Sequence, residues 1–375
     1  MKIVVNVIPL LSPLTGVGKY TLQLTRTLMT IDKSNEYIFY NGFYSQNLRL
    51  SEGMQKKKLF NFKETIFSFP LIKKIARSIN ILSFKFKKEK FDIYFEPNFI
   101  PLPIPAKRTV VTVHDFSFFH FPEWHPAERI KYFQKHFWEK IKRADKIIFD
   151  SNFIKDESIR LFSFPAEKLK TIYLGIDKNI YRMYDPRDLI GISKKYSLPP
   201  KFIFFLGSIE PRKNLKHLLL AYLNLDAPIR KEFKLVLAGF KGWKNEEIHS
   251  LIKKSNGDVK YIGYMPEEDL GKVLNLAHLF LFPSFYEGFG LPPLEAMACG
   301  CPVITSNTSS LPEICADAAF YVNPYDVNDI SSAITKIICN ENLKKNLIKK
   351  GLERASIFDW EISARMHLEL FSEIF

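Results

Sequence analysis

Short apolar runs alternate with helical patterns along the chain, and this alternation starts afresh near the middle. In the first half, the apolar runs 2–8 and 109–114 are each followed by a stretch with helical spacing. A passage rich in Gly, Pro and Asp ends at Pro200, and a second cycle begins with the apolar run 202–206. Alternation of this kind is typical of parallel β-sheets covered by helices. The sequence therefore predicts an α/β protein with two doubly wound, Rossmann-like domains.

The predicted elements also give the domain boundaries. We expect a first domain over 1–175, a linker over 176–200, a second domain over 201–357 and a last amphipathic helix over 358–375. Because ligands of doubly wound sheets bind at the carboxyl ends of strands, functional residues should directly follow strands. The expected strands are 2–8, 37–40, 91–95, 109–114, 146–149 and 171–174, then 202–206, 235–238, 259–262, 278–282 and 303–305, with helices between them.

The net charge of +14 favours an anionic partner, and the distribution of the charge along the chain indicates which class of partner is meant. The stretch 56–90 carries eleven Lys or Arg against two acids, with aromatic and aliphatic residues between them. Such a segment suits peripheral contact with an anionic membrane, and it equally suits a solvated helix packed on its own domain. Charges and aromatics form no recognised nucleic-acid module, so no nucleic acid is expected as a partner.

Several absences restrict the chemistry and the location. The four cysteines have no partners at a metal-ligand spacing, and no Asp-x-Asp motif is present, so we expect no metal and no cofactor. The sequence has no signal peptide and no run of 18 apolar residues. We therefore expect a cytoplasmic protein, peripheral on the inner face of the membrane if the basic stretch binds lipid.

The strongest motif is E-G-F-G-L-P-P-L-E, from Glu287 to Glu295, between a strand and a helix. Gly288 and Gly290 allow the backbone to approach a ligand closely, and free N–H groups at the helix start attract phosphate. Glu287 lies on the loop and Glu295 about one turn into the helix, so both carboxylates can face one pocket. A purely structural turn would rarely need two glutamates and two glycines.

A second motif, G-S-I-E-P-R-K-N, begins at Gly207 and joins the first strand and helix of the second domain. Arg212 and Lys213 are well placed there to neutralise a diphosphate leaving group. The alternative is a helix N-terminus with surface cations, which the helix dipole disfavours.

Two weaker signals lie in the first domain. Gly16 and Gly18 follow the first strand, although a Gly-x-Gly turn is common. His114 and Asp115 end the 109–114 strand at its carboxyl end. A lone histidine is more often a hydrogen-bonded structural residue than a ligand, so this position alone leaves both interpretations open.

The two glutamates, separated by seven residues in their E-G-F-G-L-P-x-x-E setting, resemble the signature of retaining glycosyltransferases of the GT-B fold, the glycogen-synthase and mannosyltransferase group. This resemblance covers nearly the whole chain. It implies two facing Rossmann-like domains, a deep cleft between them and a last helix that crosses back to the first domain. Four further motifs agree in order: F-P-E-W-H-P at 121–126, D-S-N-F-I-K at 150–155, L-G-I-D at 174–177, and Phe358, Trp360 and Glu361 in the tail.

The resemblance assigns roles to the residues of the first motif. Glu287 would contact hydroxyls of the donor sugar, and Glu295 would hold the ribose of the nucleotide. The backbone of Phe289, Gly290 and Leu291 would meet sugar hydroxyls and the diphosphate.

The resemblance assigns roles elsewhere as well. His114 would lie near the C6 hydroxyl of the donor sugar, and the loop with Gly16 and Gly18 would pass near the phosphates and the acceptor. Many relatives carry an arginine directly after the glycine of the second motif, where this chain has Ser208; the cation is Arg212 instead, while Lys213 matches. Residues after the next two strands should line the base pocket: Gly239, Tyr264 and Met265.

The implied reaction is glycosyl transfer with retention at the anomeric carbon, without metal, between a nucleotide-sugar donor and a glycan acceptor. The G-x-x-E-P-R-K-N form resembles a mannosyltransferase subgroup and favours GDP-mannose as the donor. UDP-glucose or another UDP-sugar is the alternative, because no residue identifies the base. The basic stretch favours a lipid-linked surface polysaccharide as the acceptor. An inactive, lectin-like partner protein is the alternative from another class.

Overall fold

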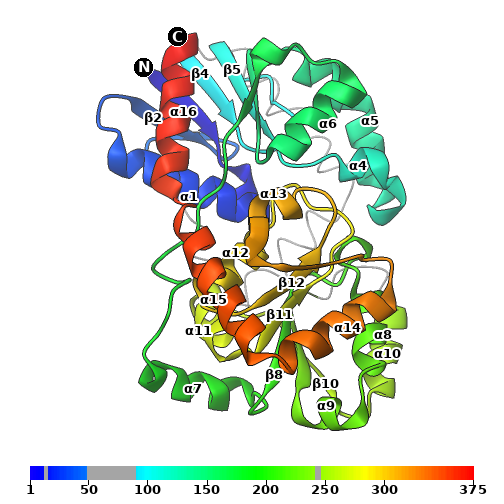
Figure 1. Ribbon diagram of the computed structural model, residues 1–375. Helices are drawn as coiled ribbons and strands as arrows, with labels where there is room; N and C mark the ends of the chain where they lie inside the picture. Colours follow the sequence, from blue (N-terminus) through cyan, green and yellow to red (C-terminus); the bar gives the residue numbers. More distant parts are fainter. Residues whose placement is uncertain (12–15, 49–89, 241–245) are drawn as a thin grey trace, which may run out of the picture.

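The computed structural model describes residues 1–11, 16–48, 90–240 and 246–375. They form two α/β units, one above the other in Figure 1, each built on a mainly parallel sheet. This arrangement confirms the predicted fold class of two facing, doubly wound domains.

The first sheet has seven described strands in the order β3-β2-β1-β4-β5-β6-β7, and only β3 is antiparallel to its neighbour. Its central strands are buried, as expected for a parallel sheet covered by helices. The strands are β1 Lys2–Asn6, β2 Glu36–Tyr40, β3 Tyr44–Ser45, β4 Phe91–Glu96, β5 Ala106–Val113, β6 Lys146–Phe149 and β7 Leu169–Thr171; the α-helices of this part are α1 Gly16–Ile31, α4 Ser117–His120, α5 Ala127–Ile141 and α6 Asn152–Phe162.

The second sheet has six described strands, all parallel, in the order β10-β9-β8-β11-β12-β13. The order reverses between β8 and β11, and ligands of doubly wound sheets bind at the carboxyl ends of the strands at such a switch point. The strands are β8 Phe202–Leu206, β9 Lys234–Ala238, β10 Val259–Gly263, β11 Leu279–Phe282, β12 Val303–Ser306 and β13 Phe320–Val322; the helices are α7 Pro186–Tyr196, α8 Leu215–Leu223, α9 Ala227–Glu232, α10 Glu246–Lys254, α11 Glu267–Leu276, α12 Leu291–Ala298, α13 Leu311–Cys315, α14 Val327–Ile338, α15 Glu341–Ser356 and α16 Trp360–Ile374.

The chain crosses between the units twice, and the two crossings lie side by side. Ile176 on the outgoing segment forms a parallel bridge with Asp359 on the returning one. A Cβ added at Gly175 would lie 2.1 Å from the backbone nitrogen of Trp360, so only glycine fits there. After this crossing, α16 packs beside α1 of the first unit (Figure 1).

The expected linker contains regular structure that its Gly, Pro and Asp content did not indicate. Helix α7 lies within it, capped by Asp185, whose side chain accepts a hydrogen bond from the backbone of Arg187. Leu189 and Ile192 are buried, and Lys195 and Tyr196 both bond to Asp269 of α11. Residues 186–196 therefore pack against the second unit.

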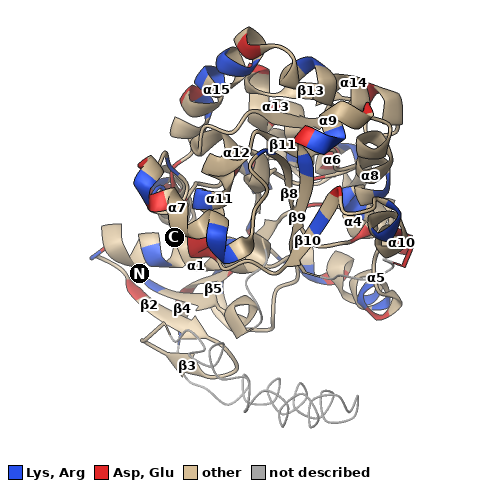
Figure 2. Ribbon diagram, turned by 90° about the horizontal axis from the view of Figure 1, so that it is seen from below, with Lys and Arg blue, Asp and Glu red and all other residues tan. Residues whose placement is uncertain are grey.

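The basic stretch 56–90 lies outside the described residues except for its last lysine, so its membrane contact stays a prediction. The rest of the chain carries a net charge of only +5. Figure 2 shows basic and acidic residues intermixed on α7 and α15. Across the four described ranges, no helix is long and apolar enough to cross a membrane. These ranges also hold no group of three or more His, Cys, Asp or Glu that could bind a metal ion.

A buried network fixes α16 to the first unit. The hydroxyl of Tyr20 lies 2.8 Å from the Thr112 hydroxyl and 3.0 Å from Nε2 of His367, whose Nδ1 donates to the carbonyl of Ser363. Burial lowers the pKa of His367 to about 4. The network therefore needs a neutral imidazole.

We expect this histidine to make stability depend on pH. Its pKa is lower in the folded state than in the unfolded chain, so the unfolded chain binds more protons and stability falls as pH drops from about 6.5 towards 4. Between pH 7 and pH 5, the free energy of unfolding should fall by about 2 kcal/mol more in the wild type than in His367→Gln. Urea denaturation at both pH values measures this difference, and parallel losses in the two proteins would contradict it.

Candidate functional site

The loops after β8 and β11 bring the two strongest motifs together at the switch point of the second sheet. One carboxylate oxygen of Glu287 lies 2.6 Å from Nη1 of Arg212, and the other lies 2.6 Å from Nζ of Lys213. Arg212 also bonds to Glu210 at 3.1 Å and to the carbonyl of Tyr286 at 3.2 Å. The sequence predicted these three charged residues separately, and the fold joins them in one cluster.

The charges of this cluster shift one another's pKa values. Burial acts to raise the pKa of Glu287, but the positive charges of Arg212 and Lys213 outweigh it and keep that pKa below its usual value. For Lys213, burial and the neighbouring Arg212 lower the pKa. The pKa of Arg212 is raised, because Glu287, Glu210 and Asp115 outweigh the effect of burial. An anionic ligand at this point would therefore meet two clustered cations.

Gly288 forms a close backbone contact between the two units. A Cβ added there would lie 1.8 Å from the carbonyl oxygen of His114. On the other side, the Ser151 hydroxyl donates to the carbonyl of Gly288 at 2.7 Å and caps α6 by accepting from the backbone of Ile154. Ser151 of the D-S-N-F-I-K motif therefore caps a helix and also contacts the loop of the strongest motif.

Helix α13 adds a second contact between the units. Both carboxylate oxygens of Glu313 accept from backbone nitrogens at the start of α6, those of Asn152 and Phe153, at 2.7 and 2.8 Å. In the same interface the Tyr286 hydroxyl donates to Glu157 of α6 and accepts from the backbone of Phe116. The loop after β11 is therefore held against the first unit on several sides.

His114 is held on both ring nitrogens. Nδ1 lies 2.6 Å from Asp150 and Nε2 lies 2.8 Å from the carbonyl of Pro97. Burial acts to lower the pKa of His114, but the charge of Asp150 and the hydrogen bonds raise it overall. Contact of this ring with a sugar hydroxyl, as the resemblance implies, would require it to give up one of these partners.

Asp115 has hydrogen-bond partners that differ from those of the adjacent His114. Its carboxylate accepts from the backbone and the hydroxyl of Ser117 at 2.9 and 2.6 Å. Burial acts to raise its pKa, but the charge of Arg212 and the bonds from Ser117 lower it. Asp115 therefore belongs to the charged cluster around Arg212.

Lys19 joins the two units at the other predicted glutamate, and sequence reasoning missed it. Its Nζ lies 3.2 Å from Glu295, 2.8 Å from Glu267 and 3.0 Å from the Tyr181 hydroxyl. The charges of both glutamates outweigh burial and raise the pKa of Lys19. Its position gave a signal, because Lys19 directly follows Gly18 in the first turn of α1, where the helix dipole disfavours a cation.

The residues predicted for the base side meet at the ends of β8, β9 and β10. Gly239 approaches so closely that an added Cβ would lie 2.0 Å from the carbonyl oxygen of Gly207. Tyr264 stacks on Phe240 with ring centroids 4.8 Å apart and is 57% exposed. Met265 is buried and packs in the core instead. The Phe240–Tyr264 pair therefore offers an aromatic surface on this side.

The other predicted residues lie on the loops after β8 and β11 and at the starts of α1 and α12. Gly16 is exposed at the start of α1, while Gly18 is buried in its first turn. Ser208 is half-buried in the loop after β8, and Leu291 is half-buried at the first position of α12. Phe289 and Gly290 have structural roles. Phe289 is buried against Tyr173 and Phe358, and Gly290 has a φ of 118°, which favours glycine.

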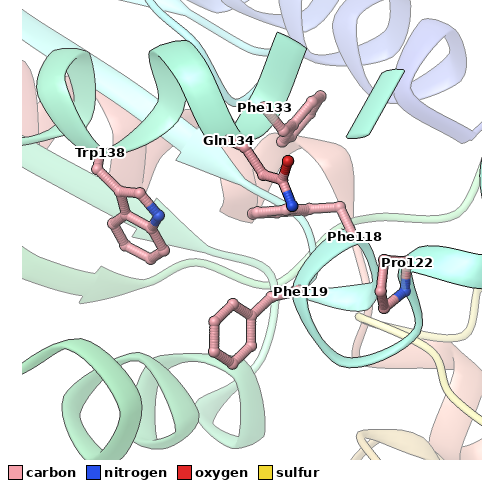
Figure 3. A pocket seen from close by; sticks show the side chains of 6 residues that line it. All are labelled: Phe118, Phe119, Pro122, Phe133, Gln134 and Trp138. Atoms are coloured by element: carbon pink, nitrogen blue, oxygen red, sulfur yellow. The ribbon is translucent and has the colours of Figure 1, made fainter. Parts of the chain in front are cut away.

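A pocket of about 170 Å³ lies elsewhere on the first unit (Figure 3). It contains none of the predicted site residues and no charged side chain, so it offers no cation to a diphosphate. Its walls are Phe118, Phe119, Pro122, Phe133, Gln134 and Trp138.

Comparison with known proteins identifies the family. The family described as "Glycosyl transferases group 1" matches residues 192–354, and "Glycosyltransferase Family 4" matches residues 15–179. The chain is 35% identical over 370 residues to an O-antigen chain mannosyltransferase B of Escherichia coli, covering 96% of this chain and 97% of that protein.

Solved structures agree on the fold. Sucrose-phosphate synthase of Thermosynechococcus elongatus superimposes with a TM-score of 0.72 at 20% identity, covering 100% of this chain and 99% of that one. Anabaena HepE in complex with UDP and glucose gives a TM-score of 0.65 at 16% identity, covering 100% of both chains. With matches that span nearly all of its length, the chain belongs to the group 1 glycosyltransferases and has their GT-B fold.

Proposed function

We propose that this glycosyltransferase moves a mannosyl residue from GDP-mannose to a glycan acceptor, with retention of configuration and without a metal ion. The observation that carries the proposal is the carboxylate of Glu287 between Arg212 and Lys213 at the switch point of the second sheet. Mannose is proposed as the sugar because an O-antigen chain mannosyltransferase matches 96% of this chain. That name also supports a growing, lipid-linked surface polysaccharide as the acceptor.

Each part of the donor has a chemically suitable neighbour. The exposed Tyr264 and its partner Phe240 suit a flat base, and Glu295 suits the hydroxyls of a ribose. Arg212 and Lys213 suit the diphosphate, and they supply positive charge where other enzymes use a metal ion. Glu287 then lies beside the sugar, where its carboxylate can accept from hydroxyls.

The reaction balances with these groups alone. The bond between the anomeric carbon and the diphosphate oxygen breaks, and the electron pair leaves with GDP, whose charge Arg212 and Lys213 stabilise. The acceptor oxygen forms the new bond from the same face, and its proton passes to the departing diphosphate. Contact between the units excludes water, which limits hydrolysis of the donor.

A ligand panel tests the donor. Thermal shift and calorimetry with GDP-mannose, GDP, UDP-glucose and UDP, all in EDTA, should show selective binding of the two GDP compounds. A ligand at 100 times its Kd stabilises the folded state by about 2.7 kcal/mol, which this panel resolves easily. Glu295→Ala should lose this stabilisation, because the ribose loses its carboxylate partner. Glu268→Ala removes an exposed carboxylate from the start of α11 and is the matched control.

The other outcomes change the proposal in defined ways. Preference for UDP compounds would keep the enzyme class and discard mannose as the sugar. Binding that is absent in EDTA and appears when MgCl2 replaces EDTA would overturn metal independence. Absence of binding of all four compounds under both conditions would favour the inactive, lectin-like partner.

A further inference from the structure

Four aromatic side chains form a continuous stack across the two units, here called the aromatic ladder: Phe121, Trp124, Phe285 and Tyr325. Phe121 lies on Trp124 with ring centroids 3.8 Å apart and planes within 9°. Trp124 stacks on Phe285 at 5.7 Å, and Phe285 stacks on Tyr325 at 4.7 Å. The first two rings belong to the segment directly after α4, in which Pro122–Trp124 form a 3-10 helix, and the last two follow β11 and β13 of the second sheet.

The two middle rings of the ladder, Trp124 and Phe285, lie beside the charged cluster. Phe285 is two residues before Glu287, and its backbone nitrogen donates to the carbonyl of Arg212 at 3.0 Å. On the first unit, His125 follows Trp124 and lies 3.0 Å from the hydroxyl of Ser117, which in turn donates to Asp115. The rings therefore extend outward from the residues that would surround the reacting sugar.

The strand order places the ladder opposite the base. The base-side residues Gly239 and Tyr264 follow β9 and β10, on one side of the switch point between β8 and β11. Phe285 and Tyr325 follow β11 and β13, on the other side. A donor with its base near Tyr264 and its sugar near Glu287 leaves the ladder side for the acceptor.

The chemistry of the ladder suits a carbohydrate. The C–H face of a pyranose ring is apolar and flat enough to lie on an aromatic ring, while its hydroxyls need polar neighbours. Tyr325, the last ring, is 60% exposed, and Trp124 and Phe285 are half-buried. Two histidines stand beside the stack: His217 lies edge-on to Phe285, and Nδ1 of His125 has no hydrogen-bond partner among the described residues.

We propose that the aromatic ladder is the acceptor subsite, and that Tyr325 binds a sugar of the glycan chain behind the one that receives the mannosyl residue. This inference rests on the proposed function. It adds that the enzyme recognises an extended glycan through stacking rather than a single terminal sugar. Tyr325 then sets the preference of the enzyme for longer acceptors and takes no part in forming the new glycosidic bond.

Acceptor series of increasing length test this subsite. Methyl α-mannoside and the corresponding α-linked di- and trisaccharides are compared as acceptors of wild type, Tyr325→Ala and Tyr325→Phe. In the wild type, kcat/KM should rise with acceptor length. Tyr325→Ala should lose about tenfold in kcat/KM for the trisaccharide, because the KM for the acceptor rises. The KM for the donor should stay unchanged. Tyr325→Phe keeps the ring and should keep the length preference.

Phe43→Ala removes an aromatic ring that is 81% exposed on the β2–β3 turn and is the matched control. A length preference that persists in Tyr325→Ala would overturn the subsite, and so would a wild type without any length preference. Calorimetry of the same oligosaccharides without donor gives a second readout that needs no turnover. Trisaccharide binding that is equal in wild type and Tyr325→Ala, or absent from both, also overturns the subsite. Failure of the proposed function would instead appear in the nucleotide panel.

Discussion

Glu287→Gln is expected to lower kcat by at least about 100-fold, since it removes the charge that holds the centre of the site together. The amide has nearly the same shape as the carboxylate, but its NH2 group would face one of the cations, Arg212 or Lys213. Both cations now bond to Glu287 at 2.6 Å. Steady-state kinetics with the donor and a glycan acceptor measure the loss.

Nucleotide binding distinguishes this effect from a general collapse of the site. Because the substitution removes an anion and leaves both cations in place, GDP should bind Glu287→Gln at least as tightly as the wild type. Glu287→Asp keeps the charge on a shorter side chain and should show an intermediate kcat. A Glu287→Gln enzyme with nearly wild-type kcat would refute the role of this carboxylate.

Gly288→Ala is expected to cause the second large loss, through the contact between the units. The new Cβ would lie 1.8 Å from the carbonyl oxygen of His114 and 3.1 Å from the Cβ of Asp115. Two backbones meet there, so the units have to move apart. A displacement of about 1 Å between reacting groups costs on the order of 100-fold in rate, and we expect a loss of this size in kcat/KM.

Gly191→Ala is the matched control for this substitution. Gly191 lies inside α7, where an added Cβ meets no atom within 4 Å. Alanine is a better helix former than glycine by about 1 kcal/mol, so this variant should retain activity and gain stability. Equal activity of Gly288→Ala and Gly191→Ala would show that the close contact at His114 does not matter for the reaction.

The sequence by itself determined the fold class, and it predicted which loops carry the candidate site residues. The alternation of apolar runs and helical patterns is a local signal that depends only on neighbouring residues. Its two cycles in this chain predict two parallel sheets. The glycines and glutamates of residues 287–295 lie on one loop and on the helix that follows it, so their spacing alone predicts a shared pocket. Arg212 and Lys213 were recognisable because they stand next to a glycine-bearing strand end.

Tertiary structure decided which of these residues meet. Lys19 and Glu295 are 276 residues apart in the sequence, and only the packing of one unit on the other joins them. His114 was predicted as a sugar contact, yet Asp150 and Pro97 occupy its ring nitrogens. Loop positions set such pairings, and local patterns carry no information about them. The aromatic ladder also exists only in the folded chain, because its rings come from three separate segments that the two sheets bring into line.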